Sequence, residues 1–235
     1  MREEYSEFEL DSSIFSNSRP YGSGRFGASQ VVTSSKDLGS GNQYLQQVFI
    51  LDDISAENQK YFIRLIEFFF KIPPHPCLHK FYGHTQTPQA SIILQYHDHR
   101  LSQIIEAQKL EKQGKLDTFR QLKTLYSQFT NTCRAKAVYG LIAGLLQIHN
   151  FGTYHRAVHP DNIFLNEKLE VIIGEFGFAK DAEEDQRTQL QKNACYQAPE
   201  IFLGADYDYT IDVYAVAMII YELLTKNQPF NGITN

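Results

Sequence analysis

The sequence predicts an α+β fold of two lobes, the first rich in strands and the second mostly helical. Residues 22–51 hold short β-type runs, ASQVVTSS and QYLQQVFIL, separated by Gly, Ser, Asn and Asp turn signals. From Leu101 onward the pattern is mostly helical. A β-rich half followed by an α-rich half indicates two lobes.

The first lobe is expected over residues 19–96. Residues 1–18 are polar and Ser-rich, and we expect them to form a flexible, loosely held N-terminal extension. Hairpins follow over residues 22–51. Residues 55–71 carry apolar side chains at helical spacing, and a cluster of prolines ends that helix. The run ASIILQY predicts the closing strand.

The second lobe is expected over residues 97–235. Residues 101–125 are charged and compatible with a helix. Residues 132–150 are apolar on nearly every face, which predicts a buried helix. Residues 210–225, TIDVYAVAMIIYELLT, predict the last long helix.

The composition describes an ordinary globular protein. With 235 residues, 43% hydrophobic residues and a net charge of -5, the chain can bury about 70% of its unfolded surface. No basic patch points to a nucleic-acid partner. Cys77, Cys133 and Cys195 lack the spacing of a disulfide framework or a zinc site, which favours a reducing compartment. With neither a signal peptide nor a membrane segment evident, we expect a cytoplasmic or nuclear protein.

Four short motifs occur in a fixed order along the chain. They are YGSGRFGAS at 21–29, HRAVHPDN at 155–162, EFG at 175–177 and APE at 198–200. A glycine-rich stretch alone is weak evidence, but the joint order and spacing resemble a eukaryotic protein kinase domain over about residues 19–235. The resemblance implies a bilobal kinase-like fold, ATP and Mg as cofactors, and a supporting role for Asp212 in the last helix.

The catalytic-loop motif departs from the family at two positions. Ala157 stands where the resemblance places the catalytic aspartate. A methyl group accepts no proton, and loss of a positioned base costs ~10²- to 10⁴-fold in rate. His159 stands at the catalytic-loop lysine, and an unperturbed histidine is mostly neutral at pH 7. We therefore expect no intact catalytic group at residues 157 and 159.

Of the two metal ligands that the resemblance implies, one keeps the family's side chain and the other does not. Asn162 matches one ligand of the family, whereas Glu175 replaces the aspartate of the metal-binding motif. Its carboxylate can still ligate magnesium, but the extra methylene moves it, and magnesium tolerates geometric error poorly.

The first lobe has lost the family's ion pair. Gln47 aligns with the third-strand lysine, and a glutamine can donate to a phosphate oxygen without neutralising it. The helix glutamate falls at Leu65 or Ile66, and neither can pair. An apolar, neutral site is expected there.

Other nucleotide-binding positions are kept. Gly22, Gly24 and Gly27 could let backbone amides approach phosphates, or could form a plain tight hairpin, and both interpretations stay open. Gln95 and Tyr96 match the hinge where adenine would lie. ATP with Mg is thus expected to bind weakly or not at all.

Two further features concern the end of the chain and its regulation. In the family, Glu200 pairs with an arginine beyond the last helix, so we expect a second lobe truncated after that helix. Thr188 is the one phospho-acceptor besides Tyr196 between the EFG and APE motifs, and Arg156 could bind a phosphate there. We favour the alternative, in which local structure holds Arg156.

These departures favour a pseudokinase, a non-catalytic signalling scaffold or allosteric partner that binds another protein. The alternative is a weak or unconventional ATP-dependent Ser/Thr protein kinase, which relies on positioning for its rate. Family assignment alone would imply phosphotransferase activity, but fold does not settle function.

Overall fold

The computed structural model describes residues 3–24, 27–39, 41–49, 56–181 and 194–230. The chain divides into two compact units. Unit 1 comprises Met1–His75 and His79–His97, and unit 2 comprises Pro76–Leu78 and Asp98–Asn235. The lobe boundary predicted between residues 96 and 97 differs from this division by one residue and by the segment 76–78. The α+β class, with one strand-rich and one helical part, is confirmed.

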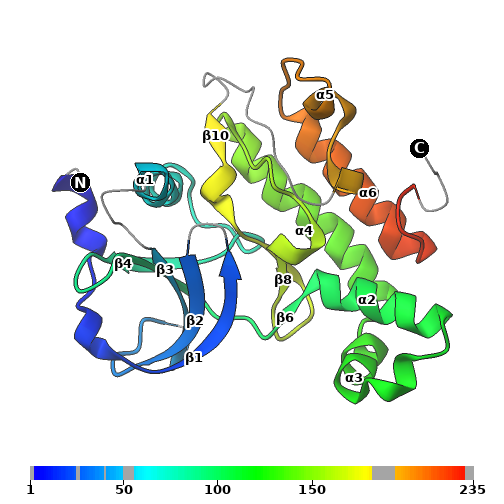
Figure 1. The fold of residues 1–235 in the computed structure, drawn as a ribbon, viewed down its shortest axis with the longest axis horizontal. Coiled ribbons are helices and arrows are strands. Elements are labelled where there is room, and N and C mark those ends of the chain that lie inside the picture. The colour runs from blue at the N-terminus through cyan, green and yellow to red at the C-terminus, as the bar shows by residue number, and fades with distance from the viewer. Residues whose placement is uncertain (1–2, 25–26, 40, 50–55, 182–193, 231–235) are drawn as a thin grey trace. The chain divides into compact units, whose positions relative to one another are not determined.

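Unit 1 is built on an antiparallel sheet in the order β1-β2-β3-β5-β4 (Figure 1). Its strands are β1 (Phe15–Gly24), β2 (Gly27–Ser34), β3 (Gln43–Phe49), β4 (Phe81–Thr85) and β5 (Ser91–Gln95). β1 begins earlier than the hairpin region expected from residue 22. Most buried positions of the sheet carry valine, isoleucine, leucine or aromatic side chains. Aromatic and β-branched residues fit such a pleated surface well.

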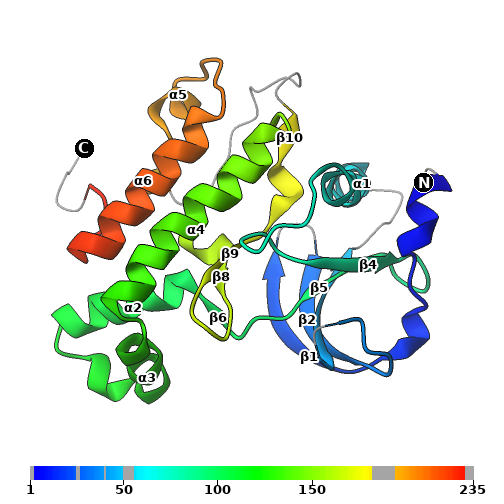
Figure 2. The ribbon, with the colours of Figure 1, turned by 180° about the vertical axis from the view of Figure 1, so that it is seen from behind.

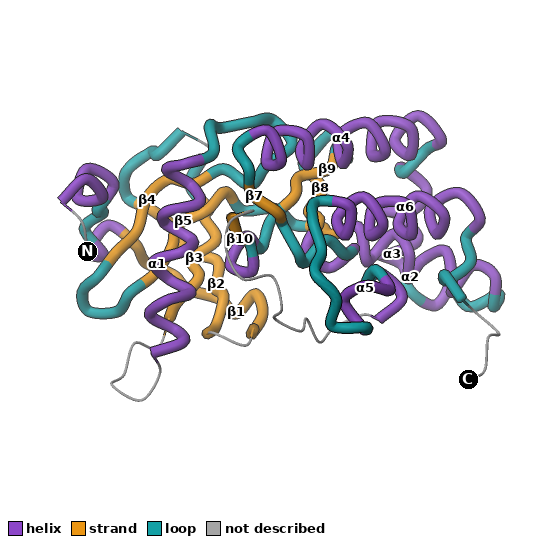
Figure 3. Tube along the Cα trace, turned by 90° about the horizontal axis from the view of Figure 1, so that it is seen from above, coloured by secondary structure: helices purple, strands orange, loops and turns teal. Residues whose placement is uncertain are grey.

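The helix of unit 1, α1 (Ala56–Lys71), lies beside this sheet (Figure 3). Aromatic rings connect the two. The rings of Phe49 on β3 and Phe62 on α1 lie 5.2 Å apart, and those of Phe69 and Phe81 stack at 4.8 Å. Such ring pairs stabilise a fold by more than the burial of their apolar area alone provides. The helical spacing predicted for this segment is therefore the spacing of its buried face.

The N-terminal segment corrects the expectation of a loosely held extension over residues 1–18. It forms two 3-10 helices, η1 (Glu3–Phe8) and η2 (Ser12–Ile14), in which Tyr5 and Ile14 are buried. The backbone N–H of Leu10 donates to the carbonyl of His84 on β4 at 2.8 Å, and the His84 ring bonds the Tyr5 carbonyl at 2.9 Å. A few apolar side chains in a polar stretch anchor the segment, a pattern that average composition hides.

Unit 2 is mostly helical. Its helices are α2 (Leu101–Lys112), α3 (Arg120–Gln128), α4 (Asn131–Asn150), α5 (Pro199–Phe202) and α6 (Thr210–Thr225), with short 3-10 turns η3 (Leu116–Thr118), η4 (Pro160–Asn162), η5 (Phe176–Phe178) and η6 (Ala194–Tyr196). Two small sheets join them: β6 (His99–Arg100), β8 (Ile163–Leu165) and β9 (Val171–Ile173) in one, and β7 (Thr153–Tyr154) with β10 (Lys180–Asp181) in the other. Helices α4 and α6 lie side by side (Figures 1 and 2). The charged, helix-compatible residues 101–125 thus form α2 and most of α3.

Helix α4 is buried on one face rather than on nearly every face. A Cβ at Gly140 would lie 2.6 Å from a methyl of Val171, and one at Gly144 would lie 2.8 Å from Cδ1 of Ile173, so these glycines let β9 approach closely. On another face, Tyr139 is 75% exposed. The glycine pair, rather than uniform hydrophobicity, sets how this helix packs.

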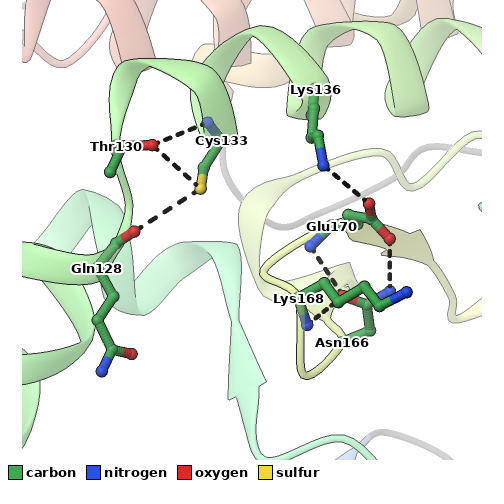
Figure 4. Close-up of polar contacts among 7 residues, drawn as sticks. All are labelled: Gln128, Thr130, Cys133, Lys136, Asn166, Lys168 and Glu170. Carbon is green, nitrogen blue, oxygen red and sulfur yellow. Dashed lines mark hydrogen bonds and ion pairs between the residues drawn. The ribbon is translucent and has the colours of Figure 1, made fainter.

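Polar contacts fix the start of α4 and the β8–β9 hairpin (Figure 4). The hydroxyl of Thr130 accepts from the backbone N–H of Cys133 at 3.4 Å and caps the helix. In the hairpin turn, Asn166 accepts from the N–H of Glu170 at 2.9 Å, and Lys136 of α4 pairs with the Glu170 carboxylate at 3.2 Å. The predicted metal ligands Asn162 and Glu175 flank this hairpin at the end opposite the turn.

All three cysteines are free thiols. Within the described part of the chain, every helix is too short or too polar to cross a membrane.

Candidate functional site

The candidate residues fall in both units. In unit 2, the buried carboxylate of Asp212 on α6 holds the catalytic-loop motif. It accepts from the backbone N–H groups of His155 and Arg156, each at 2.8 Å, and lies 2.9 Å from the ring of His149. Arg156 adopts φ 67°, which is uncommon for a residue with a Cβ. One carboxylate therefore holds a strained loop in place, as expected for a charge buried at 1% exposure.

The ring of His155 links this loop to the EFG motif. Its Nε2 donates to the carbonyl of Gly174 at 2.9 Å, and it packs edge-on against Phe176 with the centroids 5.4 Å apart. Burial lowers the pKa of His155, and the nearby Asp212 carboxylate partly opposes that shift. His155 is thus a neutral structural group.

Ala157, at the position predicted for the catalytic base, has both its backbone N–H and its carbonyl hydrogen-bonded. Its N–H donates to Nδ1 of His155 at 3.2 Å, and its carbonyl accepts from Nδ2 of Asn162 at 2.8 Å. The loop is held by peptide groups on both sides of this residue, while its side chain is a methyl group. The backbone is therefore held in place at the residue where a catalytic base is predicted, and the side chain there cannot accept a proton.

His159 and Asp161 follow in the turn η4. The Nδ1 atom of His159 lies 3.7 Å from a carboxylate oxygen of Asp161, too far for a good hydrogen bond. Arg100 donates to the Asp161 carbonyl at 3.0 Å. A cation at the lysine position thus requires a protonated His159.

Asn162 and Glu175 are brought close together. The N–H of Gly174 donates to the Asn162 carbonyl at 2.9 Å, which joins the two ends of the β8–β9 hairpin. Because Nδ2 of Asn162 is engaged, Oδ1 is the atom of that side chain able to ligate a cation. Burial raises the pKa of Glu175, and Arg100 opposes the rise only in part.

These two side chains fit a magnesium ion in kind, since Mg²⁺ is often held by one or two protein oxygens with phosphates and water. Because the pKa of Glu175 is raised, a proton competes with a cation for this carboxylate more strongly than for an exposed one. Among the described residues, no group of three or more His, Cys, Asp or Glu side chains could hold a metal ion.

The guanidinium of Arg156 is used locally. It donates to the carbonyl of Phe178 at 3.4 Å and lies over the ring of Tyr207 at 5.6 Å. These contacts favour the structural interpretation of Arg156 over phosphate binding. Thr188 lies outside the described residues.

A second buried acid in unit 2 was missed at the sequence level. Glu222 of α6 is 1% exposed and accepts a short hydrogen bond from the hydroxyl of Tyr196, with Lys109 3.8 Å away. Burial and this acid raise the pKa of Tyr196. A single glutamate within the apolar stretch AVAMIIYELL was the signal that could have found it.

In unit 1, the three glycines differ in what they do. Gly24 pairs with Gly27 across the β1–β2 hairpin. A Cβ at Gly27 would lie 1.8 Å from the carbonyl oxygen of Val48, whereas no described atom lies within 4 Å of a Cβ built at Gly22. The strand packing itself therefore requires Gly27, so its presence says little about phosphate.

The position of the lost ion pair is neutral in unit 1. Gln47 lies on β3 opposite Ser29 and Ile92 and is half-buried. Leu65 and Ile66 are both buried on α1. Apolar packing thus occupies both positions at which the helix glutamate was sought.

Two side chains that the sequence analysis did not single out hold the backbone of residues 95–97, which includes the predicted hinge. The ring Nε2 of His79 donates to the Gln95 carbonyl at 2.7 Å, and the hydroxyl of Tyr21 donates to the His97 carbonyl at 3.0 Å. The rings of Tyr21 and Tyr96 meet edge-on at 5.8 Å. The carbonyl of Gln95, at the predicted adenine position, and that of His97, just after it, already accept protein hydrogen bonds.

Comparison with known proteins agrees with this geometry. The family described as protein kinase domain matches residues 15–235. The chain therefore belongs to the protein kinase domain family, which confirms the resemblance drawn from its motifs.

Individual relatives match over shorter stretches. Mitogen-activated protein kinase p38a of Drosophila melanogaster is 40% identical over 96 residues, which are 40% of this chain and 26% of that protein. Serine/threonine-protein kinase plk-2 of Caenorhabditis elegans is 35% identical over 98 residues, 40% of this chain and 15% of that protein. Aurora/IPL1-related protein kinase 2 of the same organism is 29% identical over 114 residues, 48% and 37% of the two chains. The chain spans about a quarter or less of the first two relatives.

Proposed function

We propose that this chain is a pseudokinase domain that acts on a protein partner as a signalling scaffold or allosteric module, in the cytoplasm or nucleus. The observation that carries the proposal is Ala157. Asp212 and Asn162 hold the catalytic loop in place around this residue, yet no proton acceptor stands on it. A catalytic loop that keeps its backbone contacts but has no base supports a structural role rather than a catalytic one.

The charges needed for phosphoryl transfer are also reduced. Gln47 cannot neutralise a phosphate, and His159 carries a cation only when protonated. Kinase rates depend on positioning together with electrostatic stabilisation of the transferring group. Loss of several such groups at once supports a non-catalytic role.

ATP with magnesium is proposed to bind weakly or not at all. Asn162 and Glu175 would hold the metal, and Gly22, Gly24 and the hinge residues would meet the nucleotide. When bound, magnesium would neutralise phosphate charge. The hydrogen bonds already made to the carbonyls of Gln95 and His97 compete with an adenine.

A weak or unconventional Ser/Thr kinase is the second candidate. Its support is Asn162, which keeps the side chain of the family's metal ligand, together with the carboxylate of Glu175 at the other predicted metal position.

A thermal-shift titration with ATP, with and without magnesium, separates these outcomes for nucleotide binding. Saturation at 100 times the dissociation constant stabilises a fold by about 2.7 kcal/mol, or several degrees for a chain of this size. We expect at most a small shift at millimolar ATP. A large magnesium-dependent shift that Asn162→Ala abolishes would contradict weak binding and favour the second candidate.

A further inference from the structure

A cavity of about 270 Å³ lies within unit 1, away from every residue discussed so far as a kinase-site candidate. The start of β1, the strands β2 and β3, and the turn after β4 form its walls. Gln30 of β2 and Gln46 of β3 contribute their amides, and Phe15 and Pro88 contribute apolar surface. Because side chains alternate along a strand, Gln46 and the kinase-site candidate Gln47 point to opposite faces of the sheet.

The lining of this cavity is polar and neutral. Serine, asparagine, glutamine and threonine side chains supply hydroxyl and amide groups, and Phe15, Val32 and Pro88 supply apolar patches. None of the described residues that line it is charged, although the chain carries 49 Lys, Arg, Asp and Glu residues (22 and 27). Such a lining offers an ion no compensating charge and therefore favours a neutral ligand.

A directed chain of hydrogen bonds runs from the lining residues Gln30 and Gln46 through the buried Ser91 to Thr85 and Gln89. Gln30 donates to Gln46 at 2.8 Å, and Gln46 donates to the buried hydroxyl of Ser91 at 2.9 Å. Thr85 donates to the carbonyl of Gln89 at 2.8 Å, so its single proton is used and Ser91 must donate to Thr85 across 2.7 Å. Every donor points the same way, which leaves the Gln30 side-chain oxygen as the accepting end.

A hydroxyl group that donates to Gln30 would extend this chain, and each bond in such a chain polarises the next. The rim adds a second observation. Asn17 adopts φ 52°, and the β1–β2 register shifts between Ser16 and Arg19, so a bulge stands at the edge of the cavity. Bulges and left-handed residues of this kind are enriched at binding sites.

We propose that this cavity binds a neutral, polyhydroxylated small molecule of about one sugar ring. The hydroxyls of such a ligand match the amides and hydroxyls of the lining, and its C–H faces match the apolar surfaces of Phe15 and Pro88. The volume lies just below the range of about 300–1,000 Å³ that holds drug-sized ligands, as suits a single ring.

The test is a titration of the full 235-residue chain with D-glucose, followed by NMR of the side-chain amide signals. We expect saturable, millimolar shifts of the Gln30 and Gln46 signals. Gln30→Leu should weaken binding about tenfold, the effect of losing one to two hydrogen bonds. Gln43→Leu is the matched control, because it makes the same change at an exposed position of β3 outside the cavity, and it should leave the affinity unchanged.

Several results would overturn the proposal. These are the absence of saturable shifts, equal affinity in Gln30→Leu and Gln43→Leu, tighter binding of D-glucuronate than of D-glucose, or binding of propionamide without binding of glucose. If Gln30→Leu does not fold, Ser16→Phe fills the cavity from its exposed rim and leaves the hydrogen-bond chain intact. Unchanged glucose binding in Ser16→Phe would equally contradict the assignment.

Discussion

The proposed departures from an active kinase take different forms in the catalytic-loop motif of unit 2 and in the β3–α1 region of unit 1. In unit 2 the buried carboxylate of Asp212 keeps its backbone partners, and the loop keeps its strained shape around Ala157. In unit 1 the positions predicted for the family's charged pair are uncharged, and Leu65 and Ile66 are packed as core residues. The difference shows that polar atoms which hold the fold are separable from those which perform the chemistry.

The reason lies in the cost of buried charge. Asp212 is hydrogen-bonded to the N–H groups of His155 and Arg156 and to the ring of His149, whereas a buried glutamate on α1 without its lysine would be left uncompensated. Loss of a catalytic side chain that reaches solvent leaves no such penalty. Framework charges are therefore expected to persist, and orphaned pair members are expected to become apolar.

The largest expected effect comes from Asp212→Ala. Removing the carboxylate leaves the N–H groups of His155 and Arg156 without an acceptor, and we expect a loss of about 3–5 kcal/mol in the free energy of unfolding. Urea denaturation measures it. Asp208→Ala is the control, because Asp208 accepts only at the exposed start of α6 and should cost about 1 kcal/mol. Equal losses would contradict the framework role of Asp212.

Gly27→Ala should destabilise the chain by about 1–3 kcal/mol or more, because the new methyl meets the Val48 carbonyl. Gly22→Ala should be nearly neutral in thermal unfolding. This pair sharpens the comparison by separating a glycine required by strand packing from one that is free to serve a ligand. Similar melting temperatures for both variants would show that the strands adjust.

Thr130→Ala should cost about 1 kcal/mol, because the cap of α4 is lost. Thr124→Ala removes a hydroxyl that donates to the carbonyl of Arg120 within α3, and should change stability by less than about 0.5 kcal/mol. Chemical denaturation of both variants measures how much the helix cap contributes to the free energy of unfolding, for comparison with the contribution of Asp212. A loss at Thr130 as large as that at Asp212 would break the comparison.

The smallest effect expected near neutral pH is the titration of His155. Its pKa is lowered by burial, so the folded state resists a proton that the unfolded state accepts. Stability should be fully present above pH ~6.5, the unfolded pKa, and should fall as pH drops toward the folded pKa. His155→Phe keeps a ring against Phe176 and should flatten this slope between pH 7.5 and 5.5. Parallel slopes in the two proteins would assign the pH dependence to other groups.

Much of the fold was predictable from local pattern. The turn signals of residues 22–51, the apolar spacing in 55–71 and the order of the four motifs were sufficient for the class and the family. The packing of the N-terminal segment was missed because single residues, Tyr5 and Ile14, carry it.

The site was predictable where identity alone decides chemistry, as at Ala157. Contacts between distant residues were not, because nothing near His79 in the sequence marks its bond to the carbonyl of Gln95. The same is true of Tyr196 and Glu222, which meet across 26 residues. Such pairs depend on tertiary packing.

The most direct test of the central claim is a phosphotransfer assay with radiolabelled ATP and magnesium, comparing the natural chain with Asn162→Ala. The account predicts that both proteins, shown to be folded, stay at the background without protein. A signal from the natural chain that Asn162→Ala abolishes would contradict it, because that variant removes a ligand of the metal that phosphoryl transfer requires.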